Sequence, residues 1–158
     1  MNLTWIIVVH YLHVLAGITW FGGYMFMALG VWPALLRRPP AEAKATLQTM
    51  DRFVGRLMML SGTLVFWLGI LRGTWLGPIK SWGYLLTTAY GLTFLMALLL
   101  TLVLTVHGAA SSRTMYAKVW EGDRFRPGAA RYIRNSNLLS LGGFVVVLLC
   151  MVLMRFGF

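Results

Sequence analysis

Acidic residues and cysteine are scarce in this sequence. Its 158 residues include four Asp or Glu, fourteen Lys or Arg, and one cysteine, Cys150. A single cysteine excludes an intramolecular disulfide, and a lone cysteine in an apolar run is usually a small packing residue. Because the four acids are expected in loops, a carboxylate proton relay across a membrane is not favoured, nor is a secondary transporter.

Charged residues as a whole are also few, and they leave long uncharged runs. Only 11% of the residues are charged and 59% are hydrophobic, whereas a soluble domain usually has about a quarter charged residues. A hydrocarbon core about 30 Å thick needs roughly 20 apolar helical residues, so the runs predict membrane spans. No charged residue occurs within 3–32, 57–71, 81–112 and 135–154.

The runs predict an all-α integral membrane protein, an up-down-up-down four-helix bundle that forms one transmembrane domain over residues 1–158. Arg72 would lie within the second span and snorkel toward the interface. Pro33 and Pro39 mark the end of the first helix, because the residue before a proline avoids helical geometry. The helices are expected at about 3–35, 52–76, 81–112 with an extension to about 121, and 132–156.

Most of the basic residues fall in two of the expected connections. The positive-inside rule places these connections in the cytoplasm and both termini outside. We therefore expect a multi-pass protein of a bacterial-type inner (plasma) membrane, whose positive charge meets anionic lipids rather than nucleic acid. The chain opens without a basic n-region, so its first run is expected to remain uncleaved. The two connections carry Arg37, Arg38, Lys44, Arg52, Arg56, Arg113, Lys118, Arg124, Arg126, Arg131 and Arg134, against Arg72, Lys80 and Arg155 on the other side.

The first span contains two histidines, His10 and His13, which share one helix face at i, i+3 spacing. Plain helix packing in a membrane favours small or aliphatic residues on such a face. Histidine is a common axial ligand of haem, and a glycine leaves room for a flat macrocycle. We expect at least one of the two histidines to be a ligand, the alternative being a hydrogen bond across the bundle. The face continues through Gly17, Trp20, Tyr24 and Met27.

The third histidine, His107, lies toward the C-terminal end of the third span, on the opposite side of the membrane from His10 and His13. At 1.5 Å per residue, His107 and His13 differ in depth by on the order of 20 Å, so one iron is not expected to bind both. The simpler interpretation of His107 is an interfacial residue near a helix C-terminus; the alternative is a second haem or porphyrin site. Met151 and Met154 fall near the depth of His10. They are candidate ligands of haem iron or Cu(I), although methionine is also a common packing residue.

The second span carries Gly55, Gly62 and Gly69 at heptad spacing, a stripe of small residues that allows close helix packing. Arg52 and Arg56, an i, i+4 pair before this span, are expected to anchor to lipid phosphates. The alternative is that they clamp porphyrin propionates, together with two arginines at the start of the last helix. Those two arginines are Arg131 and Arg134.

The segment His13-Val-Leu-Ala-Gly-Ile-Thr-Trp20-Phe-Gly-Gly23 resembles the signature of the copper-resistance D (CopD-like) membrane family and of the related HemJ-type protoporphyrinogen oxidases. The resemblance implies a four-helix fold, haem b bound through His13, and a homodimer; His10 is an addition to the family pattern. HemJ-type enzymes carry a lysine after the tryptophan of the third helix. The stretch after Trp82 has none, which disfavours porphyrinogen oxidation. The resemblance covers most of the chain, through Arg52-Phe-Val-Gly-Arg56-Leu-Met, His107 and Arg131-Tyr-Ile-Arg134-Asn135.

Three functions follow as hypotheses. The first is a haem-b-binding membrane protein that relays electrons between a quinone or a redox partner protein and another acceptor. The second is a HemJ-type protoporphyrinogen IX oxidase. The third is a copper-handling or transport accessory protein that uses histidine and methionine as ligands.

Overall fold

The chain folds as an all-α bundle of four long apolar helices, which confirms the predicted fold class. The computed structural model describes residues 3–158. Met1 and Asn2, which open the segment expected to remain uncleaved, lie outside the described residues. Each of the four helices is long and apolar enough to span a membrane, as expected of a multi-pass membrane protein. They are Leu3–Leu35 (α1 Leu3–Phe26, η1 Met27–Val31 and α2 Trp32–Leu35), α3 (Pro40–Gly73), α5 (Ala89–Val119) and α6 (Ala129–Arg155).

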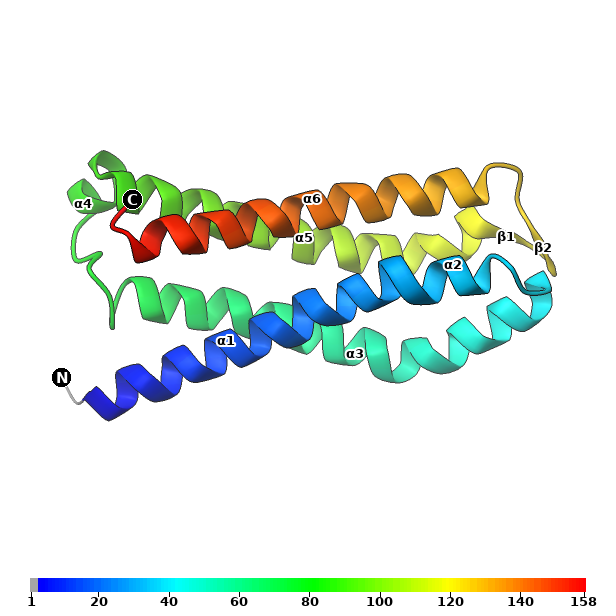
Figure 1. Ribbon diagram of the computed structural model, residues 1–158, viewed down its shortest axis with the longest axis horizontal. Helices are drawn as coiled ribbons and strands as arrows, with labels where there is room; N and C mark the ends of the chain where they lie inside the picture. The colour runs from blue at the N-terminus through cyan, green and yellow to red at the C-terminus, as the bar shows by residue number, and fades with distance from the viewer. Residues whose placement is uncertain (1–2) are drawn as a thin grey trace.

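The helices run up and down, so the bundle has two distinct ends (Figure 1). One end holds the start of α1, the C-terminus and the short helix α4 (Trp82–Thr87), and we call it the terminal end. The other end holds the turn from α2 to α3 and the hairpin of β1 (Trp120–Glu121) with β2 (Arg124–Phe125), and we call it the hairpin end. The two basic connections lie at the hairpin end. Its cytoplasmic placement remains a prediction from the positive-inside rule.

The first long helix continues through Pro33 to Leu35, so the expectation that Pro33 marks its end was wrong; the backbone widens before the proline instead. Over η1 the pattern is that of a π-helix, and the N–H of Trp32 donates to the carbonyl of Met27, five residues back. The next carbonyl, of Ala28, would pair with residue 33, but proline has no N–H. The side chain of Asn137 on α6 donates to this carbonyl instead, at 3.4 Å. The π-turn is therefore tied to a neighbouring helix.

The helix α3 begins at Pro40, so the predicted start at residue 52 was wrong. Pro39 is extended (φ −51°, ψ 133°), and Pro40 occupies the first turn, where a missing N–H costs nothing. The residues that follow are good helix formers, and Ala43 and Leu47 are fully buried against the hairpin end. A continuous helix over this segment also overturns the expected loop position of two acids. Glu42 and Asp51 are helical residues.

The predicted helix over 81–112 is broken at Thr88, which has extended geometry (φ −96°, ψ 149°). Its hydroxyl oxygen accepts a hydrogen bond from the N–H of Gly91 at 3.0 Å and so caps α5. The same hydroxyl donates to the carbonyl of Tyr84 at the end of α4, at 2.7 Å. One threonine thus ends α4 and begins α5.

We predict that Gly91→Ala will lower the free energy of unfolding by about 1–3 kcal/mol, the usual cost of overpacking. A Cβ at this position would overlap the carbonyl of Leu85 and lie 2.6 Å from the carbonyl oxygen of Tyr84, and neither backbone group can move aside cheaply. Unfolding in mixed micelles would measure the loss. Gly83→Ala in α4 is the matched control, because its Cβ would meet only Ser81 Oγ at 3.8 Å. Equal stability of the two variants would contradict the close approach of α4 to α5.

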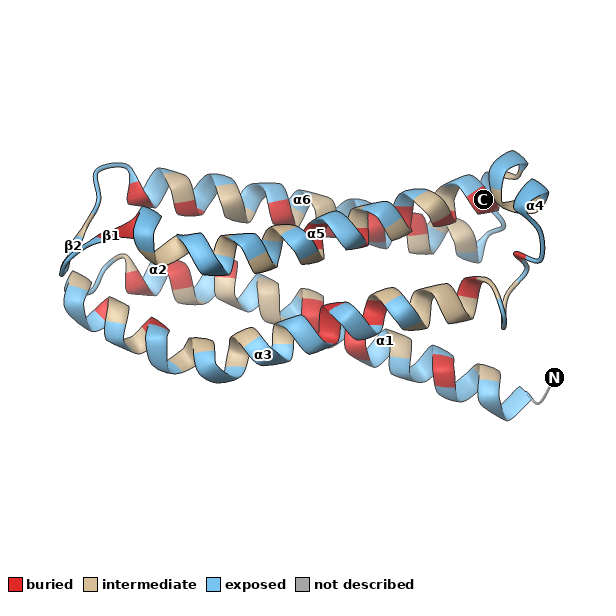
Figure 2. Cartoon of the chain, turned by 180° about the vertical axis from the view of Figure 1, so that it is seen from behind, coloured by how far each residue is buried: buried red, intermediate tan, exposed pale blue. Residues whose placement is uncertain are grey.

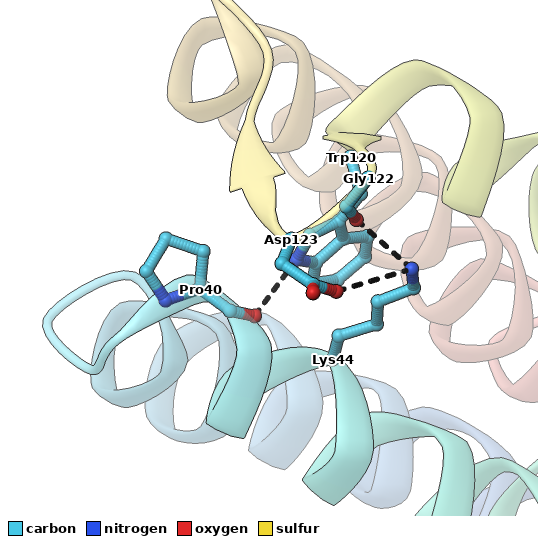
Figure 3. A network of polar contacts seen from close by, with 5 residues as sticks. All are labelled: Pro40, Lys44, Trp120, Gly122 and Asp123. Atoms are coloured by element: carbon cyan, nitrogen blue, oxygen red, sulfur yellow. Dashed lines mark hydrogen bonds and ion pairs between the residues drawn. The ribbon is translucent and has the colours of Figure 1, made fainter.

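The hairpin end is held by a compact set of contacts (Figure 3). The indole N–H of Trp120 donates to the carbonyl of Pro40 at 3.1 Å. The ammonium of Lys44 donates to the carbonyl of Gly122 at 2.9 Å and lies 4.0 Å from the carboxylate of Asp123. The extension expected to reach about 121 ends as a helix at Val119 and continues into the hairpin. The other helix ends also shift slightly from the predicted ones, with α3 ending at Gly73 and α6 covering Ala129–Arg155.

The outer faces of the bundle are apolar, and the buried residues lie between the helices (Figure 2). Large exposed side chains include Phe53 (77% exposed), Leu139 (67%) and Ile18 (65%). Such a surface on a helix bundle is suited to lipid rather than to water. Of the expected partners, the structure thus supports membrane lipids.

Candidate functional site: two histidine cavities

Two of the cavities in the bundle are lined by histidine. One, of about 340 Å³, is lined by His10 and His13, and we call it the His–Met cavity because Met151 and Met154 also line it. The other, of about 470 Å³, is lined by His107, and we call it the His107 cavity. Both volumes fall within the range of small-molecule and cofactor sites.

The His–Met cavity brings together residues from all four long helices. The histidines come from α1, whereas the methionines come from α6. Imidazole and thioether groups from different helices therefore line one cavity, in agreement with the similar depth expected for them. Its lining is completed by Val65, Phe66, Gly69, Arg72, Gly73, Pro78, Tyr90, Phe94, Ala97, Leu98, Thr101, Val147 and Arg155.

The ring of His13 is the more enclosed of the two imidazoles in this cavity. His10 is exposed, whereas His13 is half-buried. The His13 ring lies against the glycine stripe of α3, where a Cβ on Gly69 would be 3.3 Å from its Cε1 atom. The Nδ1 atom of His13 is buried and makes no well-formed hydrogen bond within 3.5 Å, although the ring lies beside the backbone of Val65. Buried polar atoms without a partner are rare in native proteins and often mark a site for a bound group.

Arg72 carries a second buried atom of this cavity that lacks a well-formed hydrogen bond. Its Nε atom is buried without a partner, and its Nη1 donates to the carbonyl of Leu76 at 3.4 Å. Within residues 3–158, Arg72 Nε and His13 Nδ1 are the two buried side-chain nitrogen or oxygen atoms that make no well-formed hydrogen bond. Arg155 also lines the cavity, and no acidic residue of the described chain does. The cavity is therefore positively charged and suited to an anionic group.

The His107 cavity is lined by several side chains that form hydrogen bonds with one another. The Nε2 atom of His107 lies 3.4 Å from the hydroxyl groups of both Ser111 and Ser136. The hydroxyl of Tyr24 donates to the Oδ1 atom of Asn137 at 3.4 Å, and the same amide donates to the π-turn. All five of the residues that provide these side-chain groups line the cavity: Tyr24, His107, Ser111, Ser136 and Asn137. Hydrogen-bonding groups from α1, α5 and α6 thus converge on one space.

The His107 cavity also contains one acid and one base from α3. Asp51 accepts a hydrogen bond from the hydroxyl of Tyr116 at 3.0 Å. Arg56 is exposed and lines the same cavity. Asp51 was expected in a loop and was missed by sequence reasoning, because the helical start of α3 was not predicted.

A buried cluster centred on aromatic side chains, which we call the aromatic layer, contributes residues to the linings of both cavities. The indole of Trp20 packs edge-on against Phe144, with ring centroids 4.7 Å apart and an angle of 77° between the planes. Trp20 is 7% exposed and lies over Gly62, where a Cβ would be 2.9 Å from the indole. Val65 and Leu104 pack into the same cluster. Both aromatic rings line the His107 cavity.

The structure divides the predicted face of α1 between the cavities. His10 and His13 line the His–Met cavity, whereas the aromatic part of the face lines the His107 cavity. Gly17 lines neither cavity. Of the arginine pair on α3, Arg56 lines the His107 cavity and Arg52 lines neither. The residues of this face in the His107 cavity are Trp20, Tyr24 and Met27.

Arg72, Tyr90 and Arg155 were not among the predicted site residues, although they line the His–Met cavity. For Arg72 a signal was present, because an ionisable residue inside an apolar span usually faces the bundle interior or a cavity. Tyr90 and Arg155 gave no such signal, since each lies near a helix end where polar residues are ordinary.

The donor set of the His–Met cavity fits haem. Imidazole and thioether are haem ligands, and two arginines match the two propionates of the macrocycle. No group of three or more His, Cys, Asp or Glu that could hold a metal ion occurs in the described part of the chain. Comparisons with protein families, curated proteins and solved structures found no match for this chain.

Proposed function

We propose that this protein binds haem b in the His–Met cavity and carries electrons within the membrane. One observation supports the proposal above the others. The two buried polar atoms that make no well-formed hydrogen bond within 3.5 Å in the described chain, His13 Nδ1 and Arg72 Nε, both belong to residues of this cavity. A bound group with a metal centre and acidic substituents would bring a partner to each residue.

His13 and Met151 are the residues of this cavity that would hold the haem iron. Packing against Gly69 restrains the His13 ring, whereas His10 is exposed and less fixed. Met151 packs against the cluster around Trp20 and comes from the facing helix α6. Haem iron supplies one-electron chemistry when bound, and histidine–methionine ligation favours a high potential.

The two arginines would hold the propionates of the cofactor. Arg72 and Arg155 approach the cavity from α3 and α6 near the terminal end. We therefore propose Arg72 and Arg155 as the propionate-binding residues, in place of the pair Arg52 and Arg56. The remaining elements of the proposal are a homodimer, a bacterial-type inner membrane, and an electron donor that is a quinone or a redox partner protein.

The absorption spectrum of the purified protein tests the proposal. Expression with added haem precursor should yield a protein with a Soret band, α and β bands on reduction, and one haem b per chain by extraction and iron analysis. A colourless protein after reconstitution with haem would refute the proposal.

Copper handling is the second candidate function, because two histidines and two methionines share the His–Met cavity and suit Cu(I). A colourless protein that retains one copper ion per chain through purification would favour this candidate. Complementation of a strain that lacks protoporphyrinogen oxidase tests the hypothesis of a HemJ-type oxidase. Growth of that strain would favour a HemJ-type oxidase, despite the missing lysine after Trp82.

A further inference from the structure

We propose that the His107 cavity is a binding site for the ring of a membrane quinone. Three features of the cavity carry this inference: where it opens, which polar groups it contains, and its charge. The proposal extends the proposed function, and the redox role of the bound quinone rests on that function. Binding itself is a property of this cavity and is testable without haem.

The mouth of the cavity lies between α3 and α5. Four of its lining residues are exposed, and all four come from these two helices, whereas the lining residues of α1 and α6 are buried or half-buried. In a bundle with apolar outer faces, an opening between two spans leads into lipid. A ligand that enters there must be soluble in the bilayer. The four exposed residues are Arg56, Met59, Gly108 and Ser112.

The interior offers hydrogen bonds to a ligand with carbonyl or hydroxyl oxygens. The hydroxyl groups of Ser111 and Ser136 both lie 3.4 Å from the same His107 nitrogen. In the neutral ring that nitrogen is either one donor or one acceptor, so at least one hydroxyl is free to turn toward a ligand. A quinone ring has two carbonyl oxygens that accept hydrogen bonds, and its reduced form has two hydroxyls that donate them.

The flat walls of the cavity suit an aromatic-sized ring. Trp20, Tyr24 and Phe144 line it together, and the ring centroids of Tyr24 and Phe144 are 5.4 Å apart. Offset and edge contacts between such rings each add about 0.5–1.5 kcal/mol beyond burial, which favours a planar ligand over an acyl chain alone. The isoprenoid tail of a quinone would leave through the mouth into lipid.

The charge of the lining favours a neutral ligand over a second porphyrin. Asp51 and Arg56 contribute one negative and one positive charge, whereas the His–Met cavity has two arginines and no described acid. A porphyrin with two propionates fits the positive cavity, and a neutral ring fits the balanced one. The aromatic layer, which contributes to both linings, would then adjoin both the quinone and the proposed haem.

Photolabelling with an azido derivative of a short-chain ubiquinone tests the site. The purified protein, with and without haem, is labelled in micelles, competed with unlabelled decylubiquinone, and mapped by mass spectrometry. Label should fall on peptides of α3 and α5 around the mouth. We expect Gly108→Leu to raise the concentration needed for half-competition at least tenfold, because the new side chain stands at the mouth.

Gly142→Leu is the matched control. Both glycines are exposed helical positions where a Cβ would meet nothing within 4 Å, but Gly142 lines neither cavity. Its competition curve should match that of the unmodified protein. We also expect His107→Leu to weaken binding about tenfold and His107→Gln, which keeps a hydrogen-bonding group, to recover most of the affinity.

The outcomes separate this inference from the proposed function. The protein could be colourless and still bind the quinone, with binding lost in Gly108→Leu. That result would support the quinone site and refute only its link to haem. A haem protein that shows no competed label, or equal label in Gly108→Leu and Gly142→Leu, would overturn the quinone site alone. Two haems per chain, one of them lost in His107→Leu, would overturn it in favour of a porphyrin.

Discussion

Replacing His13 by alanine is expected to remove the haem absorbance of the purified protein. The substitution deletes the imidazole that packs against α3 and carries the buried Nδ1 atom. Without this imidazole, the exposed His10 and the thioethers of the cavity would be the remaining candidate ligands, and they would hold the iron more weakly. We expect the haem content to fall at least tenfold, measured as extracted haem b per chain after purification under identical conditions.

His10→Ala is the control for this prediction, because His10 lines the same cavity on the same helix and is exposed. It should retain most of the haem and shift the spectrum little. Imidazole added to the His13→Ala protein should restore part of the Soret band if the fold is intact. If His10→Ala loses the haem and His13→Ala keeps it, the ligand assignment is reversed.

Trp20→Ala is expected to lower the free energy of unfolding by about 3–5 kcal/mol, the range for removing a large aromatic side chain from a packed interior. Trp20 is 7% exposed and contacts both Phe144 and the surface of α3 at Gly62. Helices in lipid associate largely through such packing, so the void left behind is not offset by other forces. Unfolding in mixed micelles, followed by circular dichroism, measures the change.

Trp5→Ala on the same helix is the control, because Trp5 is 64% exposed. Its loss should change the free energy of unfolding by no more than about 0.5 kcal/mol, as for other surface substitutions. A similar loss in both variants would show that the aromatic layer is not a packing centre.

The arrangement has a simple physical logic. A membrane bundle cannot rely on burial from water to hold its helices, so close contacts at small residues do that work. Gly62 and Gly69 of the predicted stripe accept Trp20 and His13, respectively. The same stripe that packs α3 against α1 therefore positions one residue of the aromatic layer and one proposed ligand.

Much of the fold was predictable from runs of uncharged residues. The length of an apolar run and the thickness of a bilayer are enough to predict a spanning helix, and all four were found. Helix ends were less predictable, because they depend on local bonds. The start of α3 at Pro40 and the break at Thr88 were both missed, and in each case a single proline or hydroxyl sets the boundary.

The sequence by itself determined the class of the protein, the number of its spans and the shared face of His10 and His13. These properties depend on one segment at a time, through hydrophobic length and helical periodicity. Only the tertiary structure decided that this face divides at Trp20 into two cavities and that Arg72 shares a cavity with His13. The reason is that a cavity is made of faces from several helices, and their rotation and depth are set by packing between segments distant in the chain.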